Sequence, residues 1–454
     1  MIKYRFLSYK MWINFCSFAR KTNKMRKEFS DLIDKLLTKN RELGLLQLTD
    51  ESQTTDGRTV TVKGKEMVYF GSCNYLGLET DQRLKNAAKD AIDRLGTQTS
   101  YSRAGLSNNL YDTLENKLGE IFGKPTLLAP TTSLGHVSVI PVIIGERDAL
   151  IMDHQVHNSV KNAIQMVKAD GVYTETLKHN RVDYLETRIQ ILKQTYDRVW
   201  YFCDGVYSMY GDSAPFKELW QLLDKYDQFN LYVDDAHGMS WAGQHGRGMA
   251  LSKMPFHPRM ILTTSLAKGF ANCGGALVFG DEQQKSLIRN CGSSFIFSGP
   301  LQPAVLASGI ASADIHLSEE IESYQNDLFE RMLCFVERAK ELGLPVVNNE
   351  LTPIFFIGTS KAEVGYKLVK HLMDRGMLIH QNVFPTVPMK NAGLRVALTN
   401  HISIKDIHTL LDEIAEVMPK FLAEENFSME QIHEAFGLTN PAKTISDIQK
   451  LKIA

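Results

Sequence analysis

Short apolar runs alternate with helical stretches between residues 97 and 300 of the chain. The runs are apolar on both faces, as buried strands of a mostly parallel sheet are. Repeated alternation of helix and strand predicts an α/β fold with a mostly parallel sheet. The predicted strands are Thr126–Ala129, Ala149–Met152, Val199–Cys203, Leu231–Val233, Met260–Thr263 and Gly275–Phe279.

The flanking segments carry other patterns. Before residue 97, helical spacing of apolar residues predicts a helix at Glu28–Leu45 and another at Asp81–Leu95. Between them, alternating residues predict a hairpin of Thr59–Val62 with Glu66–Phe70. After residue 300, a long helical stretch (Pro303–Leu342) precedes a compact α+β unit, with strands predicted at Leu344–Val347, Pro353–Ile357, Leu378–His380 and Leu394–Ala397, and helices at Ala362–Asp374 and Ile404–Glu424.

These patterns divide the chain into five segments. Residues 97–300 form a large α/β domain, and residues 301–425 form a small C-terminal α+β domain. Residues 28–96 are an N-terminal helix and loop segment, and residues 426–454 are a helical tail. Residues 1–27 are a basic extension with eight Lys or Arg residues and no acid.

Three interpretations of the extension stay open. It is a translated stretch upstream of a natural start at Met25, which we favour, or a basic arm that touches a membrane or partner, or a disordered segment. Its apolar run, Met11–Ala19, is too short to span a bilayer. We therefore expect no stable membrane insertion, and at most peripheral contact.

Composition narrows the function classes. The 454 residues are 44% hydrophobic and 23% charged with a net charge of −1, which is ordinary globular composition and favours no nucleic-acid binding. The six cysteines form no CxxC pair, so reduced thiols in a cytoplasmic protein are expected. No ligands cluster at zinc or calcium spacing, and we expect no metal site.

Polar residues that follow the predicted strands are candidate ligands, because open α/β sheets bind at the carboxyl ends of their strands. Lys268 follows a cluster of hydroxyls after one strand, and a lysine amine can condense with an aldehyde. Asp234 and His237 follow another strand, where a carboxylate can keep a pyridine nitrogen protonated. His157 follows a third, and its flat ring can stack on a cofactor.

Hydroxyls follow two more of these strands. Thr132 and Ser133 open a helical stretch, where free backbone N–H groups bind phosphate well. Ser208 lies in a turn. Each position also has a plain structural interpretation: a solvated lysine, an Asp-Asp helix cap, a satisfied histidine, or an ordinary Ser/Thr cap. Together, however, they supply what pyridoxal 5'-phosphate (PLP) needs: a phosphate cup, a stacking ring, a carboxylate and an amine.

A set of motifs resembles the α-oxoamine synthases, a branch of the fold-type I PLP enzymes that includes serine palmitoyltransferase, 8-amino-7-oxononanoate synthase, glycine C-acetyltransferase and 5-aminolevulinate synthase. The likeness spans roughly residues 30–425 and implies a central, mostly parallel sheet of seven strands. The matching stretches are Phe70–Leu78, Asp204–Asp212, Val233–Gly238, Gly246–Gly248, Ser265–Phe270, Phe297–Ser298, Phe384–Pro388 and Leu394–Arg395.

The resemblance implies roles around the cofactor. Lys268 forms the Schiff base, Asp234 pairs with the pyridine nitrogen, and His237 pairs with the phenolic oxygen. His157 stacks on the ring. Four hydroxyl residues help to hold the cofactor and its phosphate: Thr132, Ser133, Ser208 and Ser265.

It also implies roles toward the substrate and a second subunit. Arg395 grips the amino acid carboxylate, as a guanidinium fork can. Asn74 and Tyr75 lie in a loop near the site. Ser298 reaches the phosphate of the neighbouring subunit, because these enzymes form shared active sites in a homodimer.

The chain departs from the family pattern at several positions. Thr132-Ser133 stands where Gly-Phe is usual, and Ser265 stands where Thr is usual. The stretch Ser102–Ser107 is one residue short, and Tyr111 replaces a common histidine. The differences at Thr132-Ser133 and at Ser102–Ser107 bear on the identity of the substrate rather than on the cofactor.

The implied reaction is a decarboxylative condensation of an amino acid with an acyl thioester, usually acyl-CoA, to give an α-amino ketone. The overall pattern favours a serine palmitoyltransferase-like enzyme of lipid or cofactor biosynthesis. An aminotransferase or an autoinducer-type amino ketone synthase on the same fold is the alternative. A non-catalytic partner subunit is a third, against which the presence of Lys268 argues.

Overall fold

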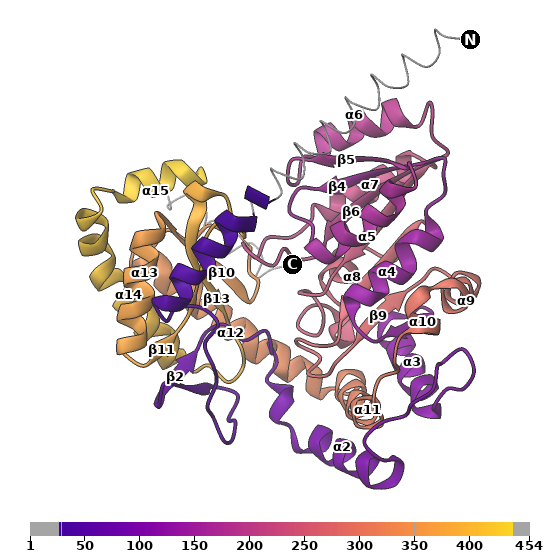
Figure 1. Cartoon of the computed structure of the whole chain (residues 1–454), viewed down its shortest axis with the longest axis horizontal. Coiled ribbons are helices and arrows are strands. Elements are labelled where there is room, and N and C mark those ends of the chain that lie inside the picture. The colour runs from indigo at the N-terminus through magenta and orange to yellow at the C-terminus, as the bar shows by residue number, and fades with distance from the viewer. Residues whose placement is uncertain (1–26, 29, 349, 439–454) are drawn as a thin grey trace, which may run out of the picture.

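The computed structural model describes residues 27–28, 30–348 and 350–438. A seven-stranded sheet with strand order β3-β9-β8-β7-β6-β4-β5 dominates one side of the molecule (Figure 1). All neighbours pair in parallel except β9, which runs antiparallel to both β3 and β8. This confirms the mostly parallel sheet. Its strands are β3 (Thr126–Ala129), β4 (Asp148–Asp153), β5 (Tyr173–Leu177), β6 (Arg198–Asp204), β7 (Phe229–Asp234), β8 (Met260–Ser265) and β9 (Gly275–Val278).

Side chains that alternate along each strand fill two cores, one on each face of this sheet. On β7, Leu231 and Val233 belong to one core and Tyr232 to the other. Because both faces are covered, every residue of β7 is buried. The helices of this part of the chain are α3 (Asn109–Phe122), α4 (Thr132–Ile143), α5 (Asn158–Ala169), α6 (Val182–Leu192), α7 (Phe216–Lys225), α8 (Met249–Lys253), α9 (Glu282–Cys291) and α10 (Ser293–Phe297).

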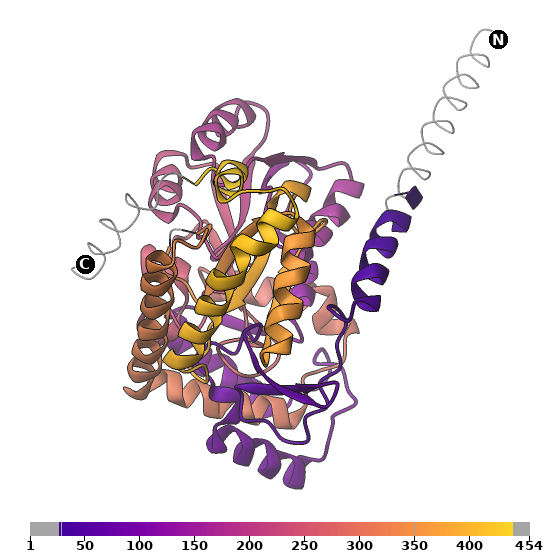
Figure 2. The same cartoon turned by 90° about the vertical axis from the view of Figure 1, so that its left-hand side faces the viewer.

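The C-terminal part forms a second unit on an antiparallel sheet with order β10-β13-β12. Its long helices lie side by side in Figure 2. Helix α11 (Pro303–Leu317) packs on α2 (Gln82–Leu95) and leads into α12 (Glu320–Glu341). The remaining elements are β10 (Ile354–Ser360), α13 (Ala362–Asp374), β12 (His380–Asn382), β13 (Ala392–Ala397), α14 (Ile404–Glu424) and α15 (Met429–Phe436).

The N-terminal hairpin joins this second unit. Strands β1 (Thr59–Val62) and β2 (Lys65–Tyr69) pair antiparallel, as the sequence predicts. Strand β2 also pairs in parallel with β11 (Met377–Leu378), so segments some 300 residues apart share one sheet. The loop that follows β2 is thereby carried to the interface between the two units.

The structure differs from the predicted elements at three places. Strand β5 was not predicted, because its side chains are polar and only partly buried at the sheet edge. The stretch Leu344–Val347 is no strand: it makes a single bridge, from Val346 to Ile357. The long helix predicted at Pro303–Leu342 is two helices, which are interrupted at Ser318.

Some expectations fall outside the described residues. The basic extension and its three interpretations concern residues 1–27, of which only residue 27 is described. The tail beyond residue 438 lies outside as well. Within the described ranges, no helix combines the length and apolar character needed to cross a bilayer.

Candidate active site

A cavity of about 310 Å³ opens where the carboxyl ends of β3, β4, β6, β7 and β8 meet. This is the edge at which ligands bind in open α/β sheets. The structure brings seven of the predicted site residues together in its wall: Thr132, Ser133, His157, Asp234, His237, Ser265 and Lys268.

The hydroxyl end of the cavity is the N-terminus of α4. Thr131 caps this helix by accepting a hydrogen bond from the backbone N–H of Leu134 (3.1 Å). The Thr132 hydroxyl donates to the Thr264 carbonyl at 3.2 Å, which ties the helix start to β8. A side chain at Gly275 would lie 2.7 Å from the Thr132 backbone, so glycine is required for this close approach. The helix end offers N–H groups and hydroxyls of the kind that bind a phosphate.

Asp234 ends β7 and is buried at the cavity wall. One of its oxygens (Oδ2) lies 3.0 Å from His136 Nε2, and the other accepts the Ala236 N–H at 3.2 Å. Burial works to raise the pKa of Asp234, but His136 and then Lys268 outweigh it and hold the pKa below its usual range. Asp234 is therefore a carboxylate, as a partner for a protonated pyridine nitrogen must be.

His136 is a site residue that sequence reasoning missed. It is fully buried one turn into α4, and its Nδ1 lies 2.8 Å from the Tyr232 hydroxyl. The available signal was its spacing: His136 is four residues after Thr132 and shares a helix face with it. Tyr232 and Asp234 thus hold the two nitrogens of one imidazole ring.

Two other carboxylates, Asp204 and Asp235, lie next to Asp234 and accept backbone N–H groups. Asp204, paired with Asp234 in the sheet register, accepts the backbone N–H of His157 at 2.9 Å. Burial and the neighbouring Asp234 charge raise the pKa of Asp204 well above its usual range. Asp235 accepts the Ala250 N–H at 2.9 Å, and burial raises its pKa to about 8. The charge at this edge is thereby concentrated on Asp234.

Two histidines frame the space beside Asp234. His157 caps α5, and its Nδ1 lies 2.6 Å from the Ser159 hydroxyl. The Nδ1 of His237 lies 2.7 Å from the Tyr75 hydroxyl. Burial, and then the charge of Lys268, lower the pKa of His237 well below its usual range. His237 is a neutral ring that can donate a hydrogen bond from Nε2 into the cavity when the tyrosine hydroxyl donates to Nδ1.

The charge of Arg395, in the second unit, acts on Lys268 in the first. Loss of hydration lowers the pKa of Lys268, and the charge of Arg395 on β13 acts in the same direction. A lysine with a lowered pKa has more of the neutral amine that attacks an aldehyde. Cys73, which sequence reasoning did not single out, lies with its sulfur 3.8 Å from Arg395 Nη2. Burial raises and the Arg395 charge lowers the pKa of this thiol, with a net lowering.

Five predicted residues lie outside the cavity wall: Asn74, Tyr75, Ser208, Ser298 and Arg395. Tyr75 acts through His237, and Asn74 precedes it in the same loop. The backbone carbonyl of Ser208 accepts a hydrogen bond from Arg395 Nε at 2.7 Å. Ser298 ends α10 beside Phe297, whose side chain is 86% exposed.

Two residues at the positions that depart from the family pattern, Arg103 and Tyr111, are buried together. Arg103 pairs with Glu115 at 3.0 Å and lies 3.6 Å above the Tyr111 ring centre. The Tyr111 hydroxyl in turn accepts the N–H of Leu301, at the start of the segment before α11. Tyr111 therefore packs against Arg103 instead of facing the cavity.

The donor set fits PLP. A helix N-terminus with hydroxyls suits a phosphate, a buried carboxylate suits a pyridinium, and a lysine of lowered pKa suits an aldehyde. All three groups line one cavity. Its volume is in the range of small-ligand pockets.

The chain is similar in sequence and structure to known PLP-dependent enzymes. A profile of the family aminotransferase class I and II matches residues 65–414. A serine palmitoyltransferase variant from S. paucimobilis with a bound PLP–myriocin aldimine is similar in structure, with a TM-score of 0.80 at 21% identity, and covers 87% of this chain and 99% of that one. An 8-amino-7-oxononanoate synthase structure from Francisella tularensis has a TM-score of 0.66 at 19% identity, over 78% of this chain and 98% of that one. The fold and the site define a PLP-dependent transferase of fold type I.

Sequence relatives narrow the class. The chain is 30% identical to an 8-amino-7-oxononanoate synthase of Thermosipho melanesiensis over 398 residues, which is 86% of this chain and 97% of that protein. It is 30% identical to a serine palmitoyltransferase of Bacteriovorax stolpii over 374 residues, or 81% and 86% of the two chains. The chain belongs to the α-oxoamine synthases, PLP-dependent acyltransferases within the aminotransferase class I and II family.

Proposed function

We propose that this protein condenses an amino acid with an acyl-CoA, with loss of carbon dioxide and release of the thiol, to form an α-amino ketone. The observation that carries the proposal is that Lys268 and Asp234 line one cavity, while the charge of Arg395 acts on Lys268 from the second unit. PLP, when bound, supplies an electron sink for the negative charge that forms at the amino acid Cα.

The residues of the chain would divide the work as follows. Lys268 holds the cofactor and, when the amino acid displaces it, becomes a free amine that can take the Cα proton at Nζ. Asp234 keeps the ring nitrogen protonated, and neutral His237 donates to the phenolic oxygen. His157 covers the ring, and hydroxyls at Thr132, Ser133 and Ser265 hold the phosphate.

Arg395 selects and orients the substrate carboxylate. Its Nε donates to the Ser208 carbonyl, which fixes the guanidinium on one side, and its Nη2 contacts the Cys73 sulfur at 3.8 Å. A fixed guanidinium binds a carboxylate in a defined orientation. That orientation would decide which bond at Cα is placed for cleavage.

The homodimer with shared sites belongs to the same proposal, with Ser298 as the residue that reaches a neighbouring phosphate. Phe297 beside it is 86% exposed, and we propose that it makes an apolar contact in this dimer. A cytoplasmic location is also proposed, and the described cysteines are unpaired.

A single experiment tests the reaction. The purified, PLP-loaded enzyme is incubated with each of the twenty amino acids, and a change in cofactor absorbance identifies those that bind. Those amino acids are then combined with palmitoyl-CoA and shorter acyl-CoAs, and free CoA and amino ketone are measured by mass spectrometry. Lys268→Ala should abolish product formation. Formation of a keto acid without release of CoA would instead identify an aminotransferase.

A further inference from the structure

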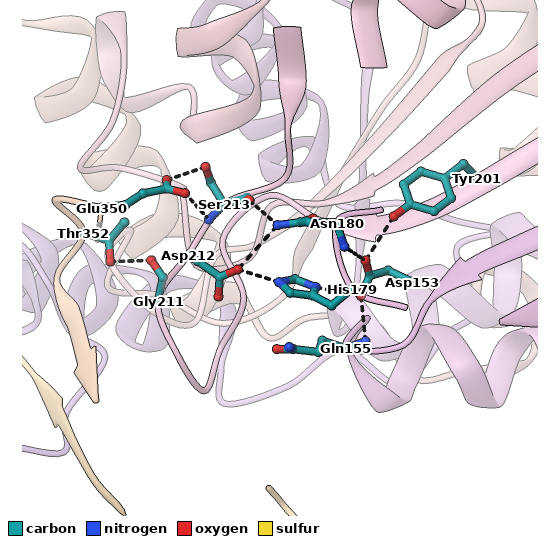
Figure 3. Close-up of polar contacts among 10 residues, drawn as sticks. All are labelled: Asp153, Gln155, His179, Asn180, Tyr201, Gly211, Asp212, Ser213, Glu350 and Thr352. Carbon is teal, nitrogen blue, oxygen red and sulfur yellow. Dashed lines mark hydrogen bonds and ion pairs between the residues drawn. The ribbon is translucent and has the colours of Figure 1, made fainter. Parts of the chain in front are cut away.

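The loop from residue 205 to 213, between β6 and α7, touches Arg395 and the second unit at once. The Ser208 carbonyl accepts a hydrogen bond from Arg395 Nε. The Gly211 carbonyl accepts one from the Thr352 hydroxyl at 2.7 Å (Figure 3). Gly211 has a φ of +76°, and a side chain there would lie 2.1 Å from the Ile354 carbonyl. The position of this loop therefore sets the position of Arg395 relative to the large sheet.

Glu350 completes the contact with the second unit. It accepts the backbone N–H of Ser213 at 3.1 Å and the Ser213 hydroxyl at 2.5 Å. A carboxylate that receives two donors from one residue holds that residue in a defined geometry. The far end of the loop is thus joined to the strands of the small sheet through residues 350–354.

His179 joins the same loop to the large sheet. Its Nδ1 lies 2.9 Å from Asp153 Oδ1, at the end of β4, and its Nε2 lies 2.5 Å from Asp212 Oδ2 in the loop. Both nitrogens face carboxylate oxygens, which only accept, so both must donate and the ring carries a positive charge. Burial works to lower the pKa of His179, but the two carboxylates raise it to about 9.

The Asp153 side of this bridge is rigid. Asp153 is fully buried and accepts the Tyr201 hydroxyl at 3.0 Å and the backbone N–H groups of Gln155 and Asn180 at 2.7 and 2.9 Å. The groups that face His179 are Asp153 from β4, Asp212 from the loop and the Tyr207 ring, whose centre is 4.4 Å away at a right angle. A change in the charge of His179 is therefore felt mainly by the loop.

We propose that His179 is a positioning residue for substrate binding: by bridging Asp153 and Asp212 it fixes the loop whose Ser208 carbonyl aims Arg395 at the substrate carboxylate. The inference rests on the proposed function of Arg395. Its mechanical part, the fixing of the loop by His179, is independent of any reaction.

Substrate binding tests the proposal with His179→Gln, which replaces the charged imidazole with a neutral side-chain amide. The matched control is His371→Gln, because His371 pairs with Glu413 at 2.8 Å between α13 and α14, far along the chain from the loop. L-Serine, L-alanine and glycine are titrated into each PLP-loaded enzyme, and the absorbance change gives the Kd. We expect the Kd for the amino acid to rise about tenfold in His179→Gln, the factor expected for loss of one charge-assisted contact. The Kd for PLP should stay unchanged in His179→Gln. In His371→Gln, neither the Kd for PLP nor the Kd for the amino acid should change.

The pH profile separates this role from a merely structural one. In the wild type, the amino acid Kd should rise as pH increases through about 9, where His179 loses its proton. In His179→Gln that part of the rise should be absent. The substrate amine and Lys268 also titrate in alkaline solution, and a rise that is identical in both proteins would belong to them and overturn the proposal.

Hydrogen exchange tests whether His179 fixes the loop of residues 205–213, whatever the substrate-binding experiments give. The amides of Tyr207 and Gly211 donate within the loop, to the carbonyls of Asp212 (2.8 Å) and Tyr207 (3.0 Å). They should exchange at least tenfold faster in His179→Gln than in the wild type or the control. Equal exchange rates would overturn the proposal. If the wild type binds none of the three amino acids, it is the proposed function that fails for these substrates, and the exchange rates alone decide on His179.

Discussion

The replacement of His136 by leucine should weaken PLP binding while the fold persists. Leucine is close to histidine in size, so it fills the space in the core behind the cavity. It removes the hydrogen bond of 3.0 Å to Asp234 and leaves Oδ2 of this carboxylate without its partner. Burial then raises the pKa of Asp234, and the carboxylate that would hold the ring nitrogen in its protonated state is less stable.

The magnitude follows from the contact that is lost. A hydrogen bond to a charged group contributes about 1.5–3 kcal/mol, and about 1.4 kcal/mol corresponds to a factor of ten in an equilibrium constant. The Kd for PLP should therefore rise by roughly 10- to 100-fold. The assay is a titration of the cofactor-free protein with PLP, followed by absorbance and by tyrosine and tryptophan fluorescence.

Tyr232→Phe provides the control. It removes the contact of 2.8 Å on the other side of the His136 ring and leaves the bond to Asp234 in place. Both variants should lose about 1–3 kcal/mol of unfolding free energy, because each leaves a buried polar atom without its partner. Only His136→Leu should lose PLP affinity strongly. A folded His136→Leu protein that binds PLP as tightly as Tyr232→Phe would refute the reasoning.

Three further outcomes are expected. Arg395→Lys should raise the amino acid KM at least tenfold with little change in PLP affinity, because an ammonium cannot replace a fork held at Ser208; an unchanged KM in steady-state assays would contradict this. Asp406→Asn should lower the unfolding free energy by about 1–2 kcal/mol at pH 7, because Asp406 pairs with Arg58 at 2.6 Å and caps α14. Burial works to raise the pKa of Asp406, but the bonds from Arg58 and Ser403 lower it on balance, so this stabilisation exists above the unfolded pKa near 3.9 and is lost as pH falls through the lower folded value. The unfolding free energies of the wild type and Asp406→Asn, measured in urea, should therefore converge in acid. A difference that stays constant with pH would exclude a contribution from the Asp406 charge. Phe297→Asp should shift a homodimer toward monomers in analytical ultracentrifugation, and identical sedimentation would remove Phe297 from the interface.

Elements with strong local signals were predicted well from the sequence. Helices α13 and α14 begin and end where the apolar periodicity places them, and β3 has the predicted bounds. Strand β5 escaped prediction because it is an edge strand with no fully buried residue. The pairing of β2 with β11 has no local signal at all, since it depends on how the two units pack.

The site shows the same division between local and distant information. Lys268 and His157 could be found because each follows a recognisable strand, and both line the cavity. The contact between Ser208 and Arg395 joins residues 187 positions apart, and it uses a backbone carbonyl rather than the predicted hydroxyl. No pattern along the chain distinguishes those two atoms. The roles of the site residues stay predictions that the variants above can test.

Asp234 and Asp235 show how strand geometry separates two interpretations that the sequence leaves mixed. Successive side chains at the end of a strand point to opposite sides. Asp234 therefore lines the cavity with His136 behind it, while Asp235 turns away to accept the N–H of Ala250 at the start of α8. Asp235 accepts an N–H from the first turn of α8, although Gly248 is the N-cap residue of that helix, and the cofactor interpretation is proposed for Asp234. Their pKa shifts differ accordingly: burial leaves Asp235 near 8, whereas His136 keeps Asp234 charged. An exchange of the two roles would require β7 to slip by one residue, which would also move Tyr232 out of the core that positions His136.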